Sequence, residues 1–233
     1  MVVVRRIAHP AHLVLVVLLS VGLVAGAPSS ASAAGPGVCA GIERCRVVAR
    51  VDVDGNGTRD PVAVTRLGED GGAHGTVVVR VRVTAHRIVK ARRVLAYWYG
   101  PVWQGAGFLD GRKGRELVVG HTAGAHSEFF RALTWRHGRL VDLRAPGGHL
   151  DWYVDGACTI AVGYLHPSGT PAGTLLHRSA ERTCGDPTYS GTAERYEWRA
   201  GKYKLVRRTT YPTLSEDVAN RWVGFRVPGL ARY

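Results

Sequence analysis

Hydrophobic and polar residues alternate over much of this chain, and a period of two is the pattern of a β-strand with one buried face. The clearest example is Thr76–Thr84. One face of this segment carries valines, and the other face carries Arg80, Arg82 and Thr84. The pattern predicts a half-buried strand.

Shorter runs of the same kind predict further strands. They are Glu116–Gly120, Glu128–Trp135, Arg139–Leu143, Cys158–Tyr164, Thr174–His177, Arg195–Arg199 and Lys202–Arg207. Breaks at Arg136-His137-Gly138 and at Ala200-Gly201 predict two β-hairpins. No long segment has the 3.6-residue period of a helix, although Arg87–Leu95 could form a helical turn or two. Recurrent turn residues favour an all-β antiparallel meander or sandwich.

The chain also repeats itself. Asp54-Gly55 recurs as Asp110-Gly111, an acid and a valine-rich segment follow in both places, and Tyr153-Val154-Asp155-Gly156 is a weaker echo. The segments Trp135–Leu140 and Trp198–Tyr203 also align. A repeat of roughly 50–60 residues built from strands and tight turns predicts blade-like units, about three in this length. We therefore expect an incomplete propeller or a sandwich-like arrangement.

The segment Asp52–Asp60 carries the most specific chemical pattern, because oxygen-bearing side chains occupy alternate positions and Gly57 lies where the chain must turn sharply. The predicted ligands are the side chains of Asp52, Asp54, Asn56 and Asp60 and the carbonyl of Thr58. Ca²⁺ prefers six to eight oxygen ligands at about 2.3–2.6 Å, so the spacing predicts a structural Ca²⁺ site. The alternative is a polar turn whose Asp side chains only cap backbone amides.

This pattern, followed by a valine-rich strand, resembles the calcium loop of FG-GAP/VCBS-type repeats, which occur in integrin-like β-propellers and in many secreted bacterial proteins. The resemblance covers Arg50–Val64 and extends weakly to Gly105–Gly120. It implies that the loop binds Ca²⁺ and braces a blade, in domains that serve adhesion or binding more often than catalysis. In the second copy Phe108 and Arg112 replace two ligands, so we expect that copy to be metal-free, with Arg112 supplying the positive charge.

Residues 1–33 have the pattern of a secretory signal. Arg5 and Arg6 precede the apolar run Leu13–Val24, and Ala31-Ser32-Ala33 provides small residues for cleavage. The apolar run is short for a membrane span, and a retained anchor is the alternative. The pattern predicts a secreted protein without a transmembrane segment after cleavage, either free outside the cell or associated with the cell wall.

The mature chain is predicted to consist of an N-terminal linker and disulfide loop, residues 34–45, and a single β-rich domain, residues 46–233. Its four cysteines predict two disulfides in an oxidising compartment, with three possible pairings. Cys39–Cys45 and Cys158–Cys184 are favoured, because each would close a loop within one region of the chain. Neither pair has the spacing of a redox or zinc motif.

The formal net charge of the chain is +13, and removal of the two signal arginines leaves +11. The abundance of Arg, Ala, Gly and Val indicates a GC-rich genome, as in actinobacteria, so part of this charge reflects composition. A basic surface attracts anions. The predicted partner is an anionic cell-wall polymer or glycan, not a specific nucleic acid, and a monomer is expected.

The aromatic tripeptide Tyr97-Trp98-Tyr99 places rings on both faces of a strand, and it is the predicted ligand patch. No catalytic motif is present in the sequence, so no catalytic residue is assigned. The prediction is a Ca²⁺-binding, non-catalytic extracellular module. The alternatives are a hydrolase of cell-wall material that assembles groups such as His126, Glu128 and Asp151, or a cationic wall-associated protein held by charge.

Overall fold

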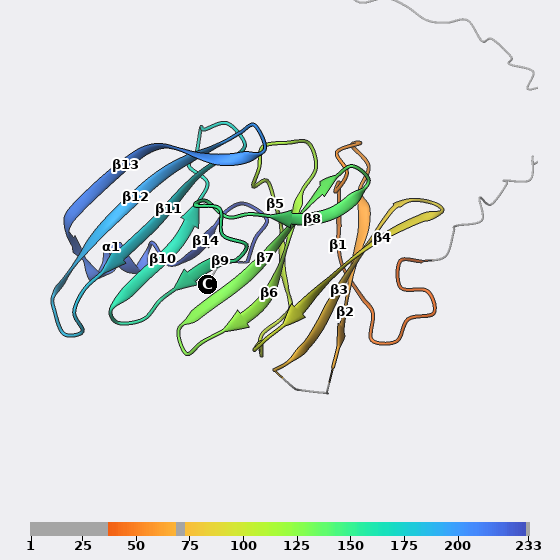
Figure 1. Ribbon diagram of the computed structural model, residues 1–233, viewed down its shortest axis with the longest axis horizontal. Coiled ribbons are helices and arrows are strands. Elements are labelled where there is room, and N and C mark those ends of the chain that lie inside the picture. Colours follow the sequence, from red (N-terminus) through yellow and green to blue (C-terminus); the bar gives the residue numbers. More distant parts are fainter. Residues whose placement is uncertain (1–36, 69–72, 232–233) are drawn as a thin grey trace, which may run out of the picture. The chain divides into compact units, whose positions relative to one another are not determined.

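Two antiparallel sheets make up nearly all of the computed structural model of this protein (Figure 1). Residues 37–68 and 73–231 are described. The predicted secretory signal, residues 1–33, lies outside the described residues, as does the beginning of the predicted linker. The all-β prediction is confirmed. The described part of the chain contains no helix with the length and apolar character that a membrane crossing requires.

The first sheet has four strands in sequence order. They are β1 (Arg46–Val51), β2 (Asp60–Leu67), β3 (Gly75–Thr84) and β4 (Arg87–Leu95). The valine face predicted for β3 is confirmed, because Val77, Val79 and Val81 are completely buried while Arg80 and Arg82 on the other face are partly exposed. This valine face packs into the core.

The helical alternative for Arg87–Leu95 is wrong. The segment is strand β4, and it pairs antiparallel with β3 along its whole length. Its β-branched residues suit a pleated strand. Lys90 and Arg92 lie two residues apart on its exposed face, so the positive charge that argued against a helix is solvated on the sheet.

The second sheet has ten strands, in the order β13-β12-β11-β10-β9-β7-β6-β5 with β8 paired to β7 and β14 paired to β10. The bounds are β5 (Trp103–Gly107), β6 (Glu116–Ala123), β7 (Ser127–Arg136), β8 (Arg139–Leu143), β9 (Trp152–Asp155), β10 (Ile160–Leu165), β11 (Thr174–Glu181), β12 (Thr188–Arg199), β13 (Lys202–Ser215), α1 (Glu216–Asn220) and β14 (Gly224–Arg226). One edge of β7 pairs with β9 near its start and with β8 near its end, which joins successive meanders into one sheet.

Both predicted hairpins are confirmed. The connections have positive φ at both residues, 48° and 78° for His137 and Gly138 and 50° and 81° for Ala200 and Gly201. These are the signs of a type I′ turn, whose twist matches that of the flanking strands. Tyr196 of the second hairpin is buried.

One core serves both sheets. Trp98, Phe130, Trp152 and Phe225 are each at most 2% exposed. The ring of Phe130 lies 5.4 Å from that of Trp98 and 5.2 Å from that of Phe225, measured between centroids. Val79 of the first sheet belongs to the same buried cluster. Burial of each such side chain stabilises the fold by about 1.5–3 kcal/mol.

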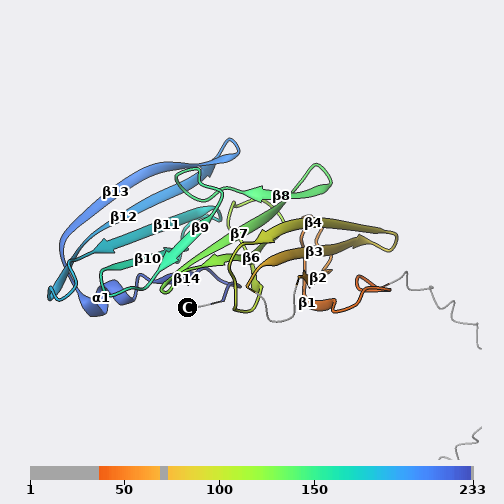
Figure 2. The same ribbon diagram turned by 60° about the horizontal axis from the view of Figure 1, so that its bottom comes forward.

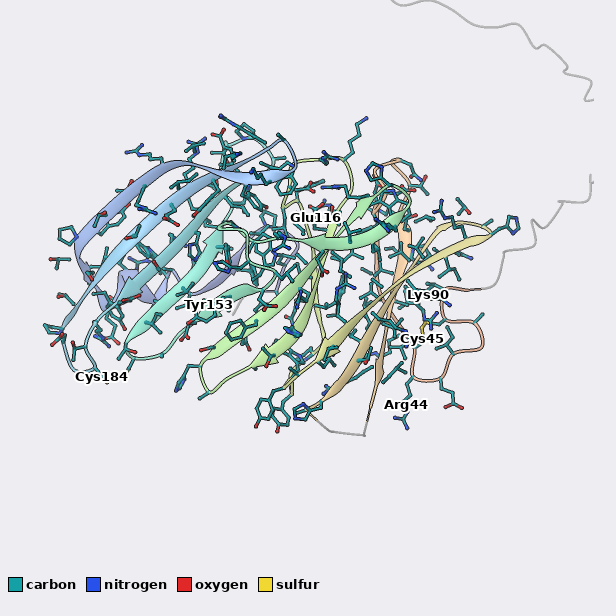
Figure 3. The ribbon with its side chains drawn as sticks, in the orientation of Figure 1. Arg44, Cys45, Lys90, Glu116, Tyr153 and Cys184 are labelled. Carbon is teal, nitrogen blue, oxygen red and sulfur yellow. A yellow bond between two sulfur atoms is a disulfide. The ribbon has the colours of Figure 1, made fainter. Side chains whose placement is uncertain are left out.

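The Cys39–Cys45 disulfide is confirmed, with an S–S distance of 2.04 Å. Cys158 and Cys184 are exposed free thiols in the structure. Cys184 lies in the loop after β11 (Figure 3). A side-chain hydrogen bond to Cys184 raises the pKa of the Cys158 thiol, so the two sulfur atoms lie close together. Their pairing remains a prediction.

Candidate metal centre

Asp-Gly turns lie at three equivalent places in the fold. The first turn, residues 52–60, connects β1 to β2, and the second turn, residues 108–116, connects β5 to β6. The third turn, residues 153–157, comprises the end of β9 and the start of its connection to β10. In each case the two connected strands are antiparallel neighbours. Each turn therefore opens a new antiparallel meander.

The first turn brings acids together. Carboxylate oxygens of Asp52, Asp54 and Asp60 all lie within 4.8 Å of one another, and no other group of three or more metal-ligating acids, histidines or cysteines occurs in the described part of the chain. Two ligands on opposite sides of one Ca²⁺ ion are at most about 4.6–5.2 Å apart, twice the ion–oxygen distance. The three carboxylates therefore fit around a single ion.

Asp52 organises the backbone of this turn. Its two carboxylate oxygens accept hydrogen bonds from the amides of Gly55 and Gly57, at 2.7 and 2.9 Å. Gly55 and Gly57 have φ of 81° and 86°, the left-handed region that side chains disfavour. A Cβ on Gly55 would also lie 2.8 Å from Cβ of Lys113, so glycine is required there for space as well.

Asp60 closes the turn from the buried side. It is 2% exposed, and its Oδ2 accepts a hydrogen bond of 2.9 Å from the amide of Val53. Burial, the largest cause, and the nearby charges of Asp54 and Asp52 raise the pKa of Asp60, while the Val53 amide opposes this. A divalent cation would offset the repulsion among these carboxylates.

The two other predicted ligands lie on the exposed side of the turn. Asn56 donates through Nδ2 to Asp54 Oδ2 at 3.1 Å, and its Oδ1 accepts the amide of Thr58 at 2.6 Å. Asp54 Oδ1 accepts the amide of Asn56 at 3.1 Å. Asn56 and Asp54 are therefore hydrogen-bonded to each other, whereas Asp52 and Asp60 bind backbone amides of the turn. The roles of Asn56 and of the Thr58 carbonyl in metal binding remain predictions.

The first turn is attached to the second turn. The amide of Arg115 donates a hydrogen bond of 2.8 Å to the main-chain carbonyl of Asp52, which joins the two sheets. A Cβ on Gly114 would lie 2.4 Å from the carbonyl oxygen of Val53. A hollow of about 370 Å³ lies between the two turns, with Asp52, Asn56 and Lys113 among its lining residues.

The second turn repeats the hydrogen bonds of the first. Glu116 Oε2 accepts the amide of Leu109 at 2.7 Å, as Asp60 does from Val53. Asp110 Oδ1 accepts the amide of Arg112 at 2.9 Å, as Asp54 does from Asn56. The fold therefore builds both turns in the same way, although their side chains differ.

The expectation that Arg112 supplies the positive charge of the second turn is wrong. The side chain of Arg112 is exposed, and the guanidinium that contacts the buried Asp110 carboxylate belongs to Arg136 at the end of β7. Thr134, also on β7, lies 3.1 Å from Glu116 Oε1 and 3.2 Å from Asp110 Oδ2 through its hydroxyl oxygen. Spacing along the sequence could not reveal these partners, because strand pairing brings β7 beside β6.

Glu116 lies inside this cluster (Figure 3). Burial, and secondly the charge of Asp110, raise the pKa of Glu116 to about 8. The hydroxyl of Thr134 has one proton and lies between two carboxyl groups, so it can donate to only one of them. A protonated Glu116 can donate to the Thr134 oxygen while Thr134 donates to Asp110, and this satisfies all three groups.

The third turn contains a single carboxylate. Asp155 Oδ1 accepts the amide of Ala157 at 2.9 Å, and its Oδ2 accepts the hydroxyls of Ser127 and Tyr153 at 2.5 and 2.6 Å. The neighbouring carboxylate and burial raise the pKa of Tyr153 to about 12, burial being the larger cause. The Asp155 carboxylate therefore links β9 to β7 through its hydrogen bond with Ser127.

The three residues of the predicted aromatic patch differ in their exposure to solvent. Trp98 is 2% exposed and belongs to the core, whereas Tyr97 and Tyr99 are 44% and 65% exposed. Their rings meet edge to face, with centroids 4.9 Å apart. Gly120 lies directly beneath Trp98, since a Cβ there would overlap the indole. Only the two tyrosines are available as a ligand patch, and no contact in the structure tests that role.

The three residues considered for hydrolysis, His126, Glu128 and Asp151, have different surroundings in the structure. Asp151 Oδ1 lies 2.9 Å from Arg131 Nε and 3.8 Å from His121 Nε2. His126 is exposed at the loop before β7, and burial raises the pKa of the partly buried Glu128.

A cavity of about 600 Å³ lies between β8 and β13. Asp142 is the one acid among its described lining residues, and Arg93 Nε lies 2.7 Å from that carboxylate.

Comparison of the chain with known protein families, with curated proteins and with solved structures found no match. By its structure, this is an all-β protein of antiparallel sheets with a carboxylate-rich turn between β1 and β2.

Proposed function

We propose that this protein is a secreted, Ca²⁺-stabilised extracellular binding module without catalytic activity. The convergence of Asp52, Asp54 and Asp60 in the first turn is the observation that carries the proposal. Three carboxylates at this spacing repel one another, a bound cation would relieve that repulsion, and oxygen ligands of this kind select a hard ion such as Ca²⁺. The resemblance to FG-GAP/VCBS calcium loops supports the same ion.

The proposed role of the ion is structural. Asp52 coordinates through its side chain while its main-chain carbonyl accepts the amide of Arg115 from the second turn. An ion that fixes Asp52 therefore also fixes the contact between the first and second sheets. The ligand of the module would be an anionic cell-wall polymer or glycan, in keeping with the net charge of +13.

Thermal unfolding of the mature protein with Ca²⁺, with Mg²⁺ and with EDTA tests the metal. A dissociation constant of about 10⁻⁴–10⁻³ M is usual for extracellular modules. Ca²⁺ at about 10 mM should then stabilise the fold by about 1.4–2.7 kcal/mol. For a chain of this length this raises Tm by about 3–10 °C.

The variant Asp52→Asn with Asp54→Asn removes two charges and keeps one acceptor oxygen at each position in place of two. It should lose the Ca²⁺ increment, and its Tm in EDTA measures the separate cost of the lost turn hydrogen bonds. The matched control, Asp186→Asn with Asp217→Asn, removes two exposed carboxylates elsewhere and should keep the increment. Equal melting of wild type and the turn variant in every buffer would refute the metal assignment.

A further inference from the structure

One face of the β12–β13 hairpin carries a large excess of positive charge. Six side chains occupy this face in three directly opposed pairs, Lys202–Arg199, Lys204–Glu197 and Arg207–Arg195. Directly opposed residues share a face, as do residues two apart on a strand. Tyr203, between the two lysines, is buried on the other face. The six-residue surface, which we call the basic hairpin face, is therefore directed away from the core.

The single acid of this face is already engaged. Glu197 is in ion-pair contact with Arg195 and with Arg199 on its own strand. Within the described residues, Lys202, Lys204 and Arg207 have no acidic partner at ion-pair distance. Five cations and one acid leave an uncompensated field over two adjacent strands.

This arrangement has a cost that core packing does not explain. Like charges directly opposite each other destabilise a sheet, and Lys202–Arg199 and Arg207–Arg195 are such pairs. Contact with Lys202 lowers the pKa of Lys204, as expected for two ammonium groups held together. Lysines on edge strand β13 can prevent edge-to-edge aggregation. Arg195 and Arg199 lie on β12, which is paired on both sides, so protection of an edge does not explain their positions.

We propose that the basic hairpin face binds a flexible linear polyanion whose charges are phosphate or carboxylate groups. The proposal names the ligand class of the binding module described above and rests on that function, but it does not depend on the metal. The Cα atoms of residues two apart on a strand lie about 6.8 Å apart, and neighbouring strands lie about 4.8 Å apart, so the side chains that carry these cations start from a closely spaced grid. Successive charges of a flexible polymer can approach such a grid one after another.

The composition of this face favours such a polymer over single-stranded nucleic acid. Proteins that bind single strands usually combine positive charge with aromatic rings on which bases stack. None of the six residues is aromatic. Recognition here would therefore come from charge alone, which makes it strongly dependent on salt.

The test measures binding of the mature protein in Ca²⁺ buffer to inorganic polyphosphate and to polygalacturonate, which separate phosphate from carboxylate. Single-stranded DNA and neutral dextran are the comparison polymers. The test variant is Lys202→Gln with Lys204→Gln. The matched control is Lys90→Gln with Arg92→Gln, which removes the same charge at the same spacing from exposed strand β4 (Figure 3).

The hairpin variant should bind at least one polyanion about tenfold more weakly, and its salt slope should fall by about 1.4 for two lost contacts. The β4 control should change affinity less than twofold. Equal losses in both variants would overturn the proposal in favour of non-specific attraction to a basic chain. Binding of DNA more tightly than of either polymer would overturn the ligand class.

A cooperative thermal transition in EDTA at the Tm of the wild type serves as the folding control, and neither lysine lines the hollow beside the first turn. A hairpin variant that keeps this transition is folded, and its binding loss then reports on the surface. Loss of the Ca²⁺ effect in the Asp52→Asn, Asp54→Asn protein with retained polyanion binding would separate the two sites.

Discussion

The carboxyl group of Glu116 is almost completely removed from water, and this makes the stability of the fold depend on pH in a specific direction. The pKa of Glu116 is raised from 4.5 to about 8 in the folded state. Asp110, Arg136 and Tyr203 are the other ionisable groups around it. The native state therefore holds a proton that the unfolded chain releases, and the resulting stability is present below pH 4.5 and lost as pH rises through 8.

We predict that Glu116→Gln removes this dependence, because the amide mimics the protonated acid. The wild type should lose stability relative to the variant between pH 5.5 and 8.5, by about 3 kcal/mol. Urea unfolding at several pH values in EDTA measures the difference. Glu181→Gln, at an exposed position, is the control. A constant difference between wild type and Glu116→Gln across this range would show that Glu116 is ionised throughout.

The β-hairpins are defined by their two-residue turns, and one of these turns contains a residue that is poorly suited to it. Ala200 has φ of 50° at the first turn position, where an L-residue without a polar side chain costs about 1–2 kcal/mol. His137 occupies the same position in the β7–β8 hairpin. Histidine tolerates the left-handed region better than alanine.

We predict that Ala200→Asn stabilises the protein by about 1 kcal/mol, because Asn-Gly is the preferred type I′ sequence. This corresponds to a rise in Tm of about 2–4 °C. His137→Asn should give a smaller gain. Thermal unfolding of the two variants in parallel checks the ranking. A fall in Tm for Ala200→Asn would be inconsistent with a type I′ turn in the β12–β13 hairpin.

The two sheets are in contact where β4 lies against β6 and β8 (Figure 2), and also where the first turn is joined to the second. The amide of Arg115 and the carbonyl of Asp52 form the hydrogen bond between these turns. Because Asp52 is also a predicted ligand, metal binding and the contact between the sheets share one residue. If the proposed ion is bound, opening of that contact requires its release.

Hydrogen exchange therefore offers a test of the whole assembly. We predict that about 10 mM Ca²⁺ slows exchange of the Arg115 amide and of the first-turn amides by about 10–100-fold. Amides at the centre of β12 and β13 should be unaffected below global unfolding. The Asp52→Asn, Asp54→Asn variant should show no slowing. Equal slowing everywhere, or none at Arg115, would argue against a brace between the sheets.

Local chemistry was enough to predict much of this protein. The valine alternation of β3, both hairpins and the turn of Asp52–Asp60 depend on residues that are close in sequence, and the period of two or the conformation of a glycine constrains them directly. The segment Arg87–Leu95 shows the limit of such reasoning. Its own pattern left helix and strand open, and pairing with β3 decided between them.

Contacts between residues that are far apart in the sequence could be identified only from the tertiary structure. Arg136 reaches Asp110 from 26 positions away because β6 and β7 pair, and this contact replaced the expected role of Arg112. The same holds for the basic hairpin face, where cross-strand register decides which charges oppose one another. Sequence patterns report on the neighbours of a residue along the chain, whereas charge compensation and burial depend on neighbours in space that only strand pairing defines.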